Sequence, residues 1–255
     1  MSEPATIHVR RLANVDYVTL NRPEVRNAFN EVVIAELTAW AEAAAKDQSL
    51  CAVVIGGAGP SFCAGADLTW MSKMAGYTQE ENLRDARAAA AMFAAIDALP
   101  VPVIAQVQGA ALGGGAGLVA VADIAVAAED ATFGFTEVKL GLIPAIIAPY
   151  ALAKIGPSAA RELFITGRRF DAAHAKAIGL VHTVVPESEL IDGVNRYLID
   201  IAKNGPEAMS AAKALLRKIA NLSIADAAPI TAETIAERRV SEEAQKMMKQ
   251  FLRRL

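Results

Sequence analysis

Apolar and polar residues follow two periods along the first part of the chain. They alternate over residues 7–11 and 17–21, which predicts two short strands, and apolar residues recur every three or four positions over 31–46, which predicts a helix. A nearly continuous apolar run over 51–57 ends in the glycine-rich segment 56–60, as expected where a buried strand meets a loop. The chain therefore opens with a β-β-α unit followed by a buried strand.

The same succession of strand, loop and helix recurs further along the chain. A predicted strand at 101–108 runs into the glycine-rich segment 109–117 and then into an alanine-rich helix. The other expected elements are helices that begin near residues 67 and 79, strands at 123–128, 133–135 and 181–185, and mostly helical structure from residue 137 onward. We predict an α/β domain over 1–203. Only helical and increasingly charged patterns follow, so we expect a separate helical region over 204–255.

Two segments rich in small residues, 61–68 and 109–117, each follow a predicted buried strand and lead into a helix. Small residues let a ligand approach the backbone closely, and the free amides at a helix N-terminus favour negative charge. Two such loops can form an oxyanion hole, in which two N–H donors converge on one carbonyl oxygen and stabilise a developing enolate.

Other interpretations of these loops are open. Glycines that only allow tight turns explain an isolated glycine triplet equally well, and Asp67 fits the N-cap of a helix. A dinucleotide-binding loop is a poorer match, because its fingerprint also requires a third small residue and an acidic residue about twenty positions further on.

Glu137 is the only carboxylate between Asp130 and Glu162, and its neighbours are mostly apolar. Apolar surroundings disfavour the charged form of a carboxyl group, which suits a group that must both take and give a proton. Glu137 is therefore the leading catalytic candidate. The alternative is an acid in the first turn of a helix, where it would interact with the helix dipole.

The sequence predicts neither a metal site nor a covalent nucleophile. Its three histidines, His8, His174 and His182, have no metal-binding spacing, and no serine or cysteine lies in a nucleophile-elbow motif.

Composition narrows the class of protein. The 255 residues carry a formal net charge of -3, which offers no broad attraction for nucleic acid or anionic lipid. The two cysteines suggest no disulfide framework, and the N-terminus lacks the regions of a secretory signal. The uncharged run 100–122 contains glutamines, prolines and glycines, so it fits a buried strand and helix better than a membrane span. We expect a cytoplasmic protein whose 54% apolar composition is partly covered by other copies of the chain.

Four segments, taken together and in this order, resemble the enoyl-CoA hydratase/isomerase (crotonase) family over nearly the whole chain. They are residues 21–29 (Asn-Arg-Pro-Glu-Val-Arg-Asn-Ala-Phe), 62–68 (Phe-Cys-Ala-Gly-Ala-Asp-Leu), 109–117, and 136–144 (Thr-Glu-Val-Lys-Leu-Gly-Leu-Ile-Pro). The family implies a spiral of β-β-α units and a C-terminal helical region that builds a homotrimer or a homohexamer. The substrate would be an acyl-CoA, so coenzyme A is part of the substrate and no separate cofactor is implied.

The resemblance also implies roles for individual residues. The backbone amides of Ala66 and Gly114 would form the oxyanion hole, and Glu137 would be the catalytic acid and base. The residues expected to contact the acyl-CoA are Arg26, Ala28, Ala64, Asp67, Leu68, Leu112, Gly113 and, from a neighbouring subunit, Phe251.

Two departures from the family pattern affect the expected reaction. Gly117 stands where typical hydratases of the family have a second catalytic glutamate, and residues 145–150 replace the usual glycine-rich continuation. The second feature, with Trp70 and Met71, is similar to bacterial methylglutaconyl-CoA and carboxygeranyl-CoA hydratases. We expect a hydratase of this kind, in branched-chain or leucine-type acyl-CoA degradation.

Two alternatives to this hydratase are an enoyl-CoA double-bond isomerase with a single glutamate and a non-catalytic acyl-CoA-binding protein. If hydration needs a second acid, the sequence offers Glu80, Glu81 and Asp85 without choosing among them.

Overall fold

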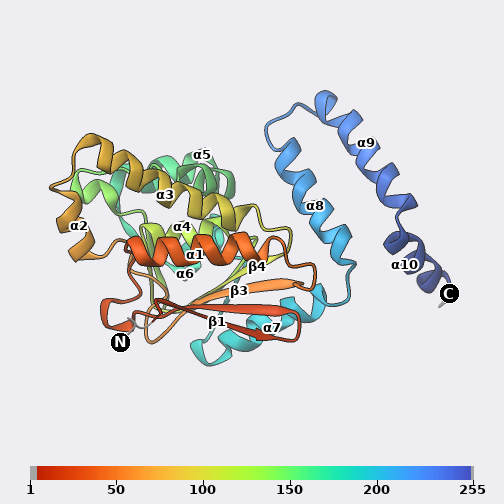
Figure 1. Ribbon diagram of the computed structural model, residues 1–255, viewed down its shortest axis with the longest axis horizontal. Helices are drawn as coiled ribbons and strands as arrows, with labels where there is room; N and C mark the ends of the chain where they lie inside the picture. The colour runs from red at the N-terminus through yellow and green to blue at the C-terminus, as the bar shows by residue number, and fades with distance from the viewer. Residues whose placement is uncertain (1–4, 254–255) are drawn as a thin grey trace.

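The computed structural model describes residues 5–253. Residues 1–4 and 254–255 lie outside this part, and so does most of the N-terminal segment on which the expectation about a secretory signal rests. Figure 1 shows the strands in the middle of the molecule, with helices on both sides of them.

The strands form a six-stranded sheet in the order β1-β2-β3-β4-β6-β9 and a three-stranded sheet in the order β5-β7-β8. The strands of the larger sheet are β1 (Ile7–Leu12), β2 (Val15–Leu20), β3 (Ala52–Gly57), β4 (Val103–Val107), β6 (Ile124–Ala128) and β9 (Thr183–Val185). Those of the smaller sheet are β5 (Ala110–Leu112), β7 (Thr132–Gly134) and β8 (Arg169–Asp171). β1 and β2 are antiparallel, whereas every further pair in the larger sheet is parallel.

Parallel neighbours need long crossovers, and here the crossovers contain helices. They are α1 (Glu31–Ala44), α2 (Leu68–Met74), α3 (Gln79–Asp97), α4 (Gly114–Val121), α5 (Ala148–Thr166) and α6 (Ala172–Ala177). Four helices follow the last strand: α7 (Leu190–Ile201), α8 (Pro206–Ile219), α9 (Ile224–Val240) and α10 (Glu242–Leu252). Short 3₁₀ helices occupy η1 (Pro23–Val25), η2 (Glu137–Leu140) and η3 (Glu187–Glu189). Each turn of the chain thus adds one strand beside the preceding one, which produces a spiral of strand and helix units.

Both faces of the larger sheet are covered. Val53 and Ile55 of β3 belong to the main core, whereas Ala52 and Val54 face a smaller core that contains residues of α7. Figure 1 shows α7 on the opposite side of this sheet from α1 and α3. Burial on both faces explains why β3 appears in the sequence as a continuous apolar run without alternation.

The structure differs from the predicted elements at two places. The segment 109–117 contains a strand, β5, before α4 begins at Gly114, so it is not a loop throughout. β8 was not predicted, because three residues of which only Phe170 is buried give too short a pattern to recognise. Both strands belong to the small sheet, and pairing with β7 stabilises them.

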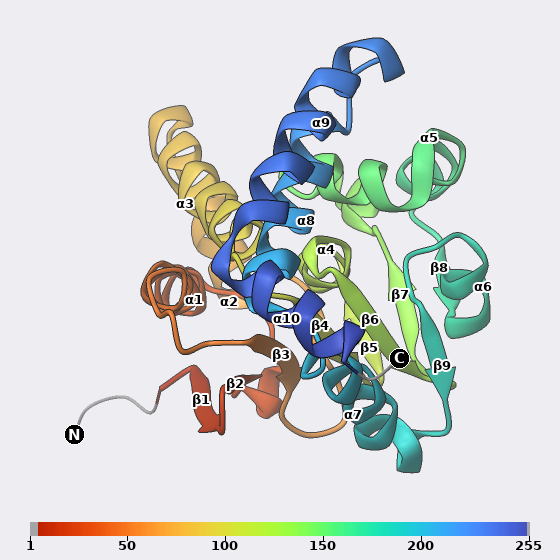
Figure 2. The same ribbon diagram turned by 90° about the vertical axis from the view of Figure 1, so that its right-hand side faces the viewer.

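The C-terminal helices α8, α9 and α10 contain no buried residues in the described chain. Figure 1 shows α9 and α10 set apart from the sheet, and Figure 2, turned by 90°, shows them in front of it. Ion pairs from Lys213 to Asp123 (2.6 Å) and from Arg217 to Asp97 (3.2 Å) connect α8 to the rest of the molecule. None of the helices within residues 5–253 is long and apolar enough to cross a membrane.

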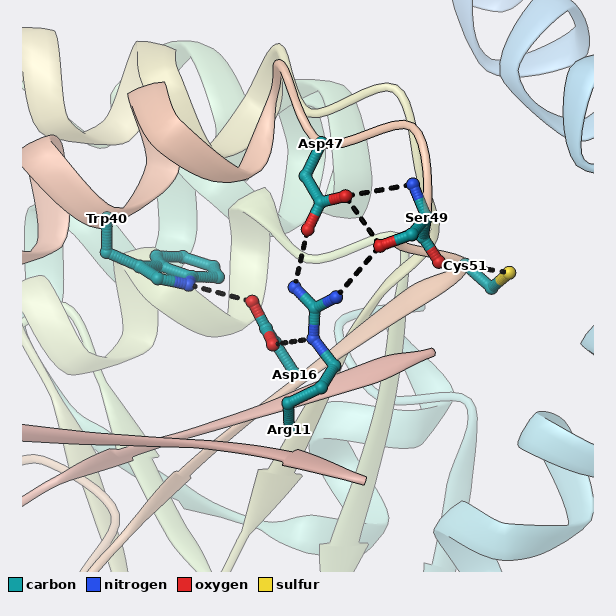
Figure 3. A network of polar contacts seen from close by, with 6 residues as sticks. All are labelled: Arg11, Asp16, Trp40, Asp47, Ser49 and Cys51. Carbon is teal, nitrogen blue, oxygen red and sulfur yellow. Dashed lines mark hydrogen bonds and ion pairs between the residues drawn. The ribbon is translucent and has the colours of Figure 1, made fainter. Parts of the chain in front are cut away.

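A polar network joins the first hairpin to α1 and to the loop before β3 (Figure 3). Asp16 is only 4% exposed, and its carboxylate accepts hydrogen bonds from the Arg11 guanidinium and from Trp40 Nε1 (3.2 Å). The same guanidinium donates to Asp47 (2.9 Å) and Ser49 (3.3 Å), which are more exposed. The buried carboxylate of Asp16 therefore connects the first hairpin to α1, two segments that come together only in the folded chain.

We expect the substitution Asp16→Ala to lower the free energy of unfolding by about 3 kcal/mol, because it leaves a guanidinium and an indole N–H without their buried acceptor. Urea denaturation measures this loss. Asp47→Ala is the matched control, since its carboxylate is 35% exposed and pairs with the same arginine. It should cost less than about 1 kcal/mol, and equal losses in the two variants would contradict this account.

Candidate active site

A cavity of about 160 Å³ lies between α2, α3, the N-terminus of α4 and the segment before α5. Its lining is mostly apolar and consists of Phe29, Ile34, Ala66, Trp70, Ala89, Met92, Phe93, Gly114, Glu137, Ile143, Pro144, Ala145, Ile146 and Ile147. The three residues predicted to be catalytic, Ala66, Gly114 and Glu137, therefore line one cavity although they are far apart in the sequence. Among the described residues that line it, Glu137 is the only one with an ionisable side chain.

The amide of Ala66 comes from the first glycine-containing loop. Phe29 pairs with this loop on both sides of Ala66, because its amide donates to Gly65 O (2.7 Å) and its carbonyl accepts from the Asp67 amide (2.8 Å). In extended backbone, successive N–H groups point to opposite sides. The Ala66 N–H therefore points away from Phe29, and it donates no hydrogen bond within residues 5–253.

The second amide belongs to Gly114, the first residue of α4. An N–H in the first turn of a helix has no intrahelical acceptor, so it is available to a ligand. The preceding residue, Gly113, has a positive φ of 51° and donates to Gly134 O (2.8 Å). A parallel bridge between Cys63 and Ala111 places the two loops beside each other.

Each glycine of the triplet lies against a different neighbour. A Cβ on Gly113 would lie 3.2 Å from Glu137 Oε1, one on Gly114 would lie 2.8 Å from the Phe29 ring, and one on Gly115 would lie 2.3 Å from Cys63 O. The triplet is therefore needed for close approach between the two loops and the carboxylate, and not only for a tight turn.

The carboxylate of Glu137 lies against the second loop at the start of η2. Its Oε2 is buried and has no hydrogen-bond partner among the described residues. Burial raises the pKa of Glu137, because the charged form of the carboxyl group loses its hydration. A raised pKa suits a carboxyl group that must both accept a proton and return it.

The position of the family's second glutamate has no room for a side chain. A Cβ on Gly117 would lie 2.3 Å from Ile147 Cγ2 and 3.1 Å from Phe93 Cε1. Ile147 is itself buried and lines the cavity, so the wall opposite the expected second acid is apolar. Among the described residues, no carboxylate lies at this part of the cavity wall.

The three other acids considered from the sequence do not line the cavity. Glu81 accepts hydrogen bonds from the amide and hydroxyl of Thr78 in a capping box, and Glu80 is exposed. Asp85 lies on the same side of α3 as Ala89, and burial raises its pKa. The proton chemistry available inside the cavity is therefore that of Glu137.

The residues predicted to contact the acyl-CoA lie in three places: at the loop that carries Ala66, in the second loop, and on α10. Arg26 is exposed and its carbonyl accepts a hydrogen bond from the Ala64 amide (2.9 Å), while Leu68 is 82% exposed at the start of α2. Ala28 and Asp67 are buried, and the Asp67 carboxylate caps α2. Ala64, Asp67 and Leu68 belong to the loop that carries Ala66, and Arg26 and Ala28 lie in the segment beside this loop.

Leu112 and Gly113 lie on the other loop. Leu112 is buried, and its amide donates to Cys63 O (2.9 Å), so this part of the second loop runs along the first. Phe251 is 64% exposed on α10, which Figure 1 places at the opposite end of the molecule from α2. Within one chain, Phe251 is not close to the cavity.

Several residues that shape the site are not evident from the sequence. Phe29, Ile147 and Trp70 form its wall, and Arg22 binds the first loop. Phe29 and Arg22 lie in the segment 21–29, one of the four that resemble the family, and this membership is the feature of the sequence that could have indicated them. No group of three or more side chains within residues 5–253 is arranged as a metal site.

Lys154 holds the other end of α4. Its ammonium, on α5, donates to Val119 O (3.0 Å) in the last turn of α4 and to the carbonyl of the C-cap residue Ala122. Together with the contact between Ile147 and Gly117, this fixes α4 against α5. Burial lowers the pKa of Lys154 to about 8, because desolvation of the ammonium outweighs the attraction of Asp123.

The pKa of Lys154 predicts a pH dependence of stability. The folded chain binds fewer protons than the unfolded chain between about pH 8 and the ordinary lysine pKa of 10.5, so stability should rise with pH across this window. The free energy of unfolding of the wild type, relative to that of Lys154→Met, should therefore rise by up to about 3 kcal/mol between the lower and the upper pH of this window. Urea denaturation at both ends measures the difference. Lys203→Met, at an exposed lysine, should show no such change, and a flat difference for Lys154→Met would contradict the assignment.

Comparisons with known proteins identify the family. The family model described as enoyl-CoA hydratase/isomerase matches residues 10–255. The 2,3-dehydroadipyl-CoA hydratase of Escherichia coli K12 is 36% identical over 211 residues, which cover 82% of this chain and 81% of that protein.

Two solved structures have the same fold. An enoyl-CoA hydratase from Shewanella pealeana has a TM-score of 0.94 and 36% identity, covering 98% of this chain and 94% of that one. An enoyl-CoA hydratase from Mycobacterium smegmatis has a TM-score of 0.93 and 32% identity, covering 99% and 97%. The predicted crotonase-like α/β fold is thus confirmed, and the chain belongs to the enoyl-CoA hydratase/isomerase family of enzymes.

Proposed function

We propose that this enzyme is an enoyl-CoA hydratase that adds water across the 2,3 double bond of an acyl-CoA thioester. The observation that carries the proposal is that Ala66 and Gly114, whose backbone amides donate to no acceptor among the described residues, line a single, mostly apolar cavity together with the buried carboxylate of Glu137. Donors of this kind stabilise negative charge that develops on a carbonyl oxygen, and water exclusion strengthens their effect.

The proposed reaction uses one carboxylate twice. The thioester oxygen accepts hydrogen bonds from the two amides, which makes C3 electrophilic. Glu137 takes a proton from water as the water oxygen bonds to C3, and the electron pair of the double bond moves onto the thioester as an enolate. Glu137 then returns the proton to C2, so the product is a 3-hydroxyacyl-CoA and the carboxylate is regenerated. The lack of space at Gly117 supports this single-acid form.

The same lack of space also favours a second candidate, a double-bond isomerase. In that reaction Glu137 removes a proton from C2 of a 3-enoyl-CoA and returns it to C4, and the enolate between the two steps is held by the same amides. No second acid and no water are required. The apolar wall formed by Ile147 and Phe93 is compatible with this reaction.

Product analysis separates the two candidates. The enzyme is incubated with a short 2-enoyl-CoA in ¹⁸O-labelled water and, separately, with the 3-enoyl isomer. A hydratase forms 3-hydroxyacyl-CoA that carries the label. Interconversion of the enoyl isomers with no hydroxyacyl product would overturn the hydratase proposal and establish the isomerase.

The acyl group is proposed from the size and polarity of the cavity. An apolar cavity of about 150 Å³ accommodates benzene, so the present cavity fits roughly six carbon atoms, including a branch. The resemblance to methylglutaconyl-CoA hydratases points to a branched chain with a terminal carboxylate. No lysine or arginine is among the described lining residues, which favours a branched chain without that charge.

A substrate panel tests the acyl group. The values of kcat/KM for methylglutaconyl-CoA and for an uncharged branched enoyl-CoA of similar size are compared, since this ratio reports differential transition-state binding. We expect the uncharged substrate to be preferred. A preference for methylglutaconyl-CoA would show that a cation outside the lining reaches the substrate.

The C-terminal helices α8, α9 and α10 support the proposal of a homotrimer or homohexamer. Large apolar side chains on them are exposed, among them Leu216, Ile224, Val240, Phe251 and Leu252. Contact with other copies would cover this surface and could place Phe251 beside coenzyme A in a neighbouring site.

A further inference from the structure

Arg22 makes contacts that connect both sides of the first loop. Its Nη1 donates to Ala28 O (2.6 Å) and its Nη2 donates to Asp67 Oδ2 (2.8 Å). The side chain of Arg22 is 17% exposed and that of Asp67 is 6% exposed. This ion pair is thus largely removed from water, and it lies immediately beside Ala66.

The Asp67 carboxylate has a second set of partners. Its Oδ1 accepts hydrogen bonds from the amides of Thr69 (2.7 Å) and Trp70 (3.2 Å), in the first turn of α2. Asp67 therefore joins the end of the Ala66 loop to the helix that follows, while Arg22 joins the same carboxylate to the segment 21–29. The hydrogen bonds of Phe29 to Gly65 and Asp67 then hold the two residues that flank Ala66.

Asn27 fixes the segment that carries Arg22. Its Oδ1 accepts a hydrogen bond from the Arg22 amide (2.9 Å), and its Nδ2 donates to Ala58 O (2.8 Å) and Ser61 O (2.7 Å). Asn27 is 1% exposed and has a positive φ of 55°. The guanidinium is consequently attached to a rigid turn, and movement of the loop relative to this turn would break the bonds of Arg22.

We propose that Arg22 is a positioning residue of the reaction: by bridging Ala28 O and Asp67, it keeps the Ala66 N–H directed at the thioester oxygen. This inference rests on the proposed oxyanion role of Ala66. Arg22 touches neither the cavity nor the reacting atoms, so it acts through the loop. Its effect should fall on the enolate-like transition state more than on ground-state binding.

The chemistry of the two acceptors explains why arginine is needed. A carbonyl oxygen and a carboxylate oxygen are reached by different nitrogens of one planar guanidinium. Lysine would keep the charge but could not reproduce this fixed fork. The variants Arg22→Lys and Arg22→Met therefore separate geometry from charge.

The test combines kinetics with a spectroscopic measurement. A cinnamoyl-CoA thioester with a para-dimethylamino group is the probe, because hydrogen bonds to its carbonyl oxygen move its absorption band to longer wavelength. We expect Arg22→Met to lower kcat by about 10²-fold, to change KM little, and to abolish most of the band shift. Arg22→Lys should show a smaller loss of the same kind.

Arg11→Met is the matched control, since Arg11 also bridges acceptors from separate segments but lies in the network of Figure 3 away from the cavity. It should lower stability and leave kcat and the band shift unchanged. Folding is checked by circular dichroism, and if Arg22→Met does not fold, Arg22→Lys decides the result. A folded Arg22 variant with wild-type kcat and a full band shift would overturn the positioning role. Absence of turnover and of any band shift in the wild type would instead refute the proposed function.

Discussion

Replacement of Glu137 by Gln is expected to lower turnover by about 10³-fold while leaving acyl-CoA affinity nearly unchanged. Glutamine keeps the shape of the side chain but cannot take a proton from water, and general acid–base catalysis by a positioned group contributes about 10²- to 10⁴-fold. The cavity has no other carboxylate among its described lining residues to replace it. Steady-state kinetics and direct measurement of binding of a saturated acyl-CoA provide the two values.

The pH profile of the wild type gives an independent measurement of the same group. Since burial raises the pKa of Glu137, the acidic limb of kcat/KM should lie above the ordinary glutamate value of 4.5. Activity should fall as pH decreases through this raised pKa, because the protonated carboxyl cannot act as a base. A limb at or below the ordinary value would show that Glu137 is not the titrating group.

Asp85→Asn is the matched control for Glu137→Gln. Burial raises the pKa of both carboxyls, but Asp85 does not line the cavity. We expect its turnover to stay within about threefold of the wild type. A loss comparable to that of Glu137→Gln would identify Asp85 as a second acid, whereas unchanged turnover in Glu137→Gln would show that another group is catalytic.

Gly117→Ala is expected to lower the free energy of unfolding by about 3 kcal/mol, the upper part of the range for overpacked cores. The added Cβ would lie 2.3 Å from Ile147 Cγ2 and 3.0 Å from Ile147 Cβ, and both residues are buried. Neither α4 nor α5 can move away easily, because Lys154 holds the two helices together. Urea denaturation measures the loss.

A double variant tests the cause of this loss. Ile147→Ala removes the clashing Cγ2, so Gly117→Ala should cost less in that background, with a coupling energy of about 1–3 kcal/mol. Gly76→Ala is the control, since a Cβ there would be 3.6 Å from its nearest neighbour, and it should change stability by less than about 1 kcal/mol. Strictly additive losses would mean that Ile147 does not fill the place of the missing acid.

If these predictions hold, this chain has one catalytic carboxylate where typical hydratases of the family have two. The second is missing because position 117 is glycine and also because Ile147 fills the space that its side chain would need. A variant that carried only a glutamate at position 117 would not restore a second acid, because Ile147 occupies the required space. The single carboxylate would then have to serve both proton transfers.

Sequence by itself determined the repeating strand and helix units and the principal candidates for the site. A continuous apolar run identified β3, because this strand is buried on both faces, and a period of three to four identified α1, because this helix buries one stripe. The glycine-rich loops and the isolated Glu137 were also visible, because their chemistry depends on residue type and on local backbone conformation. Order and spacing of the motifs were sufficient to identify the family.

Only the tertiary structure decided which of these residues meet and what surrounds them. Ile147 fills the space beside Gly117, and Arg22 binds Asp67, although each pair is separated by thirty or more positions in the sequence. The short strands β5 and β8 likewise exist because β7 lies between them. A local pattern reports the period with which a segment is buried, but it does not name the partner. Which side chain occupies a given space is set by the packing of segments that the chain brings together only when it folds.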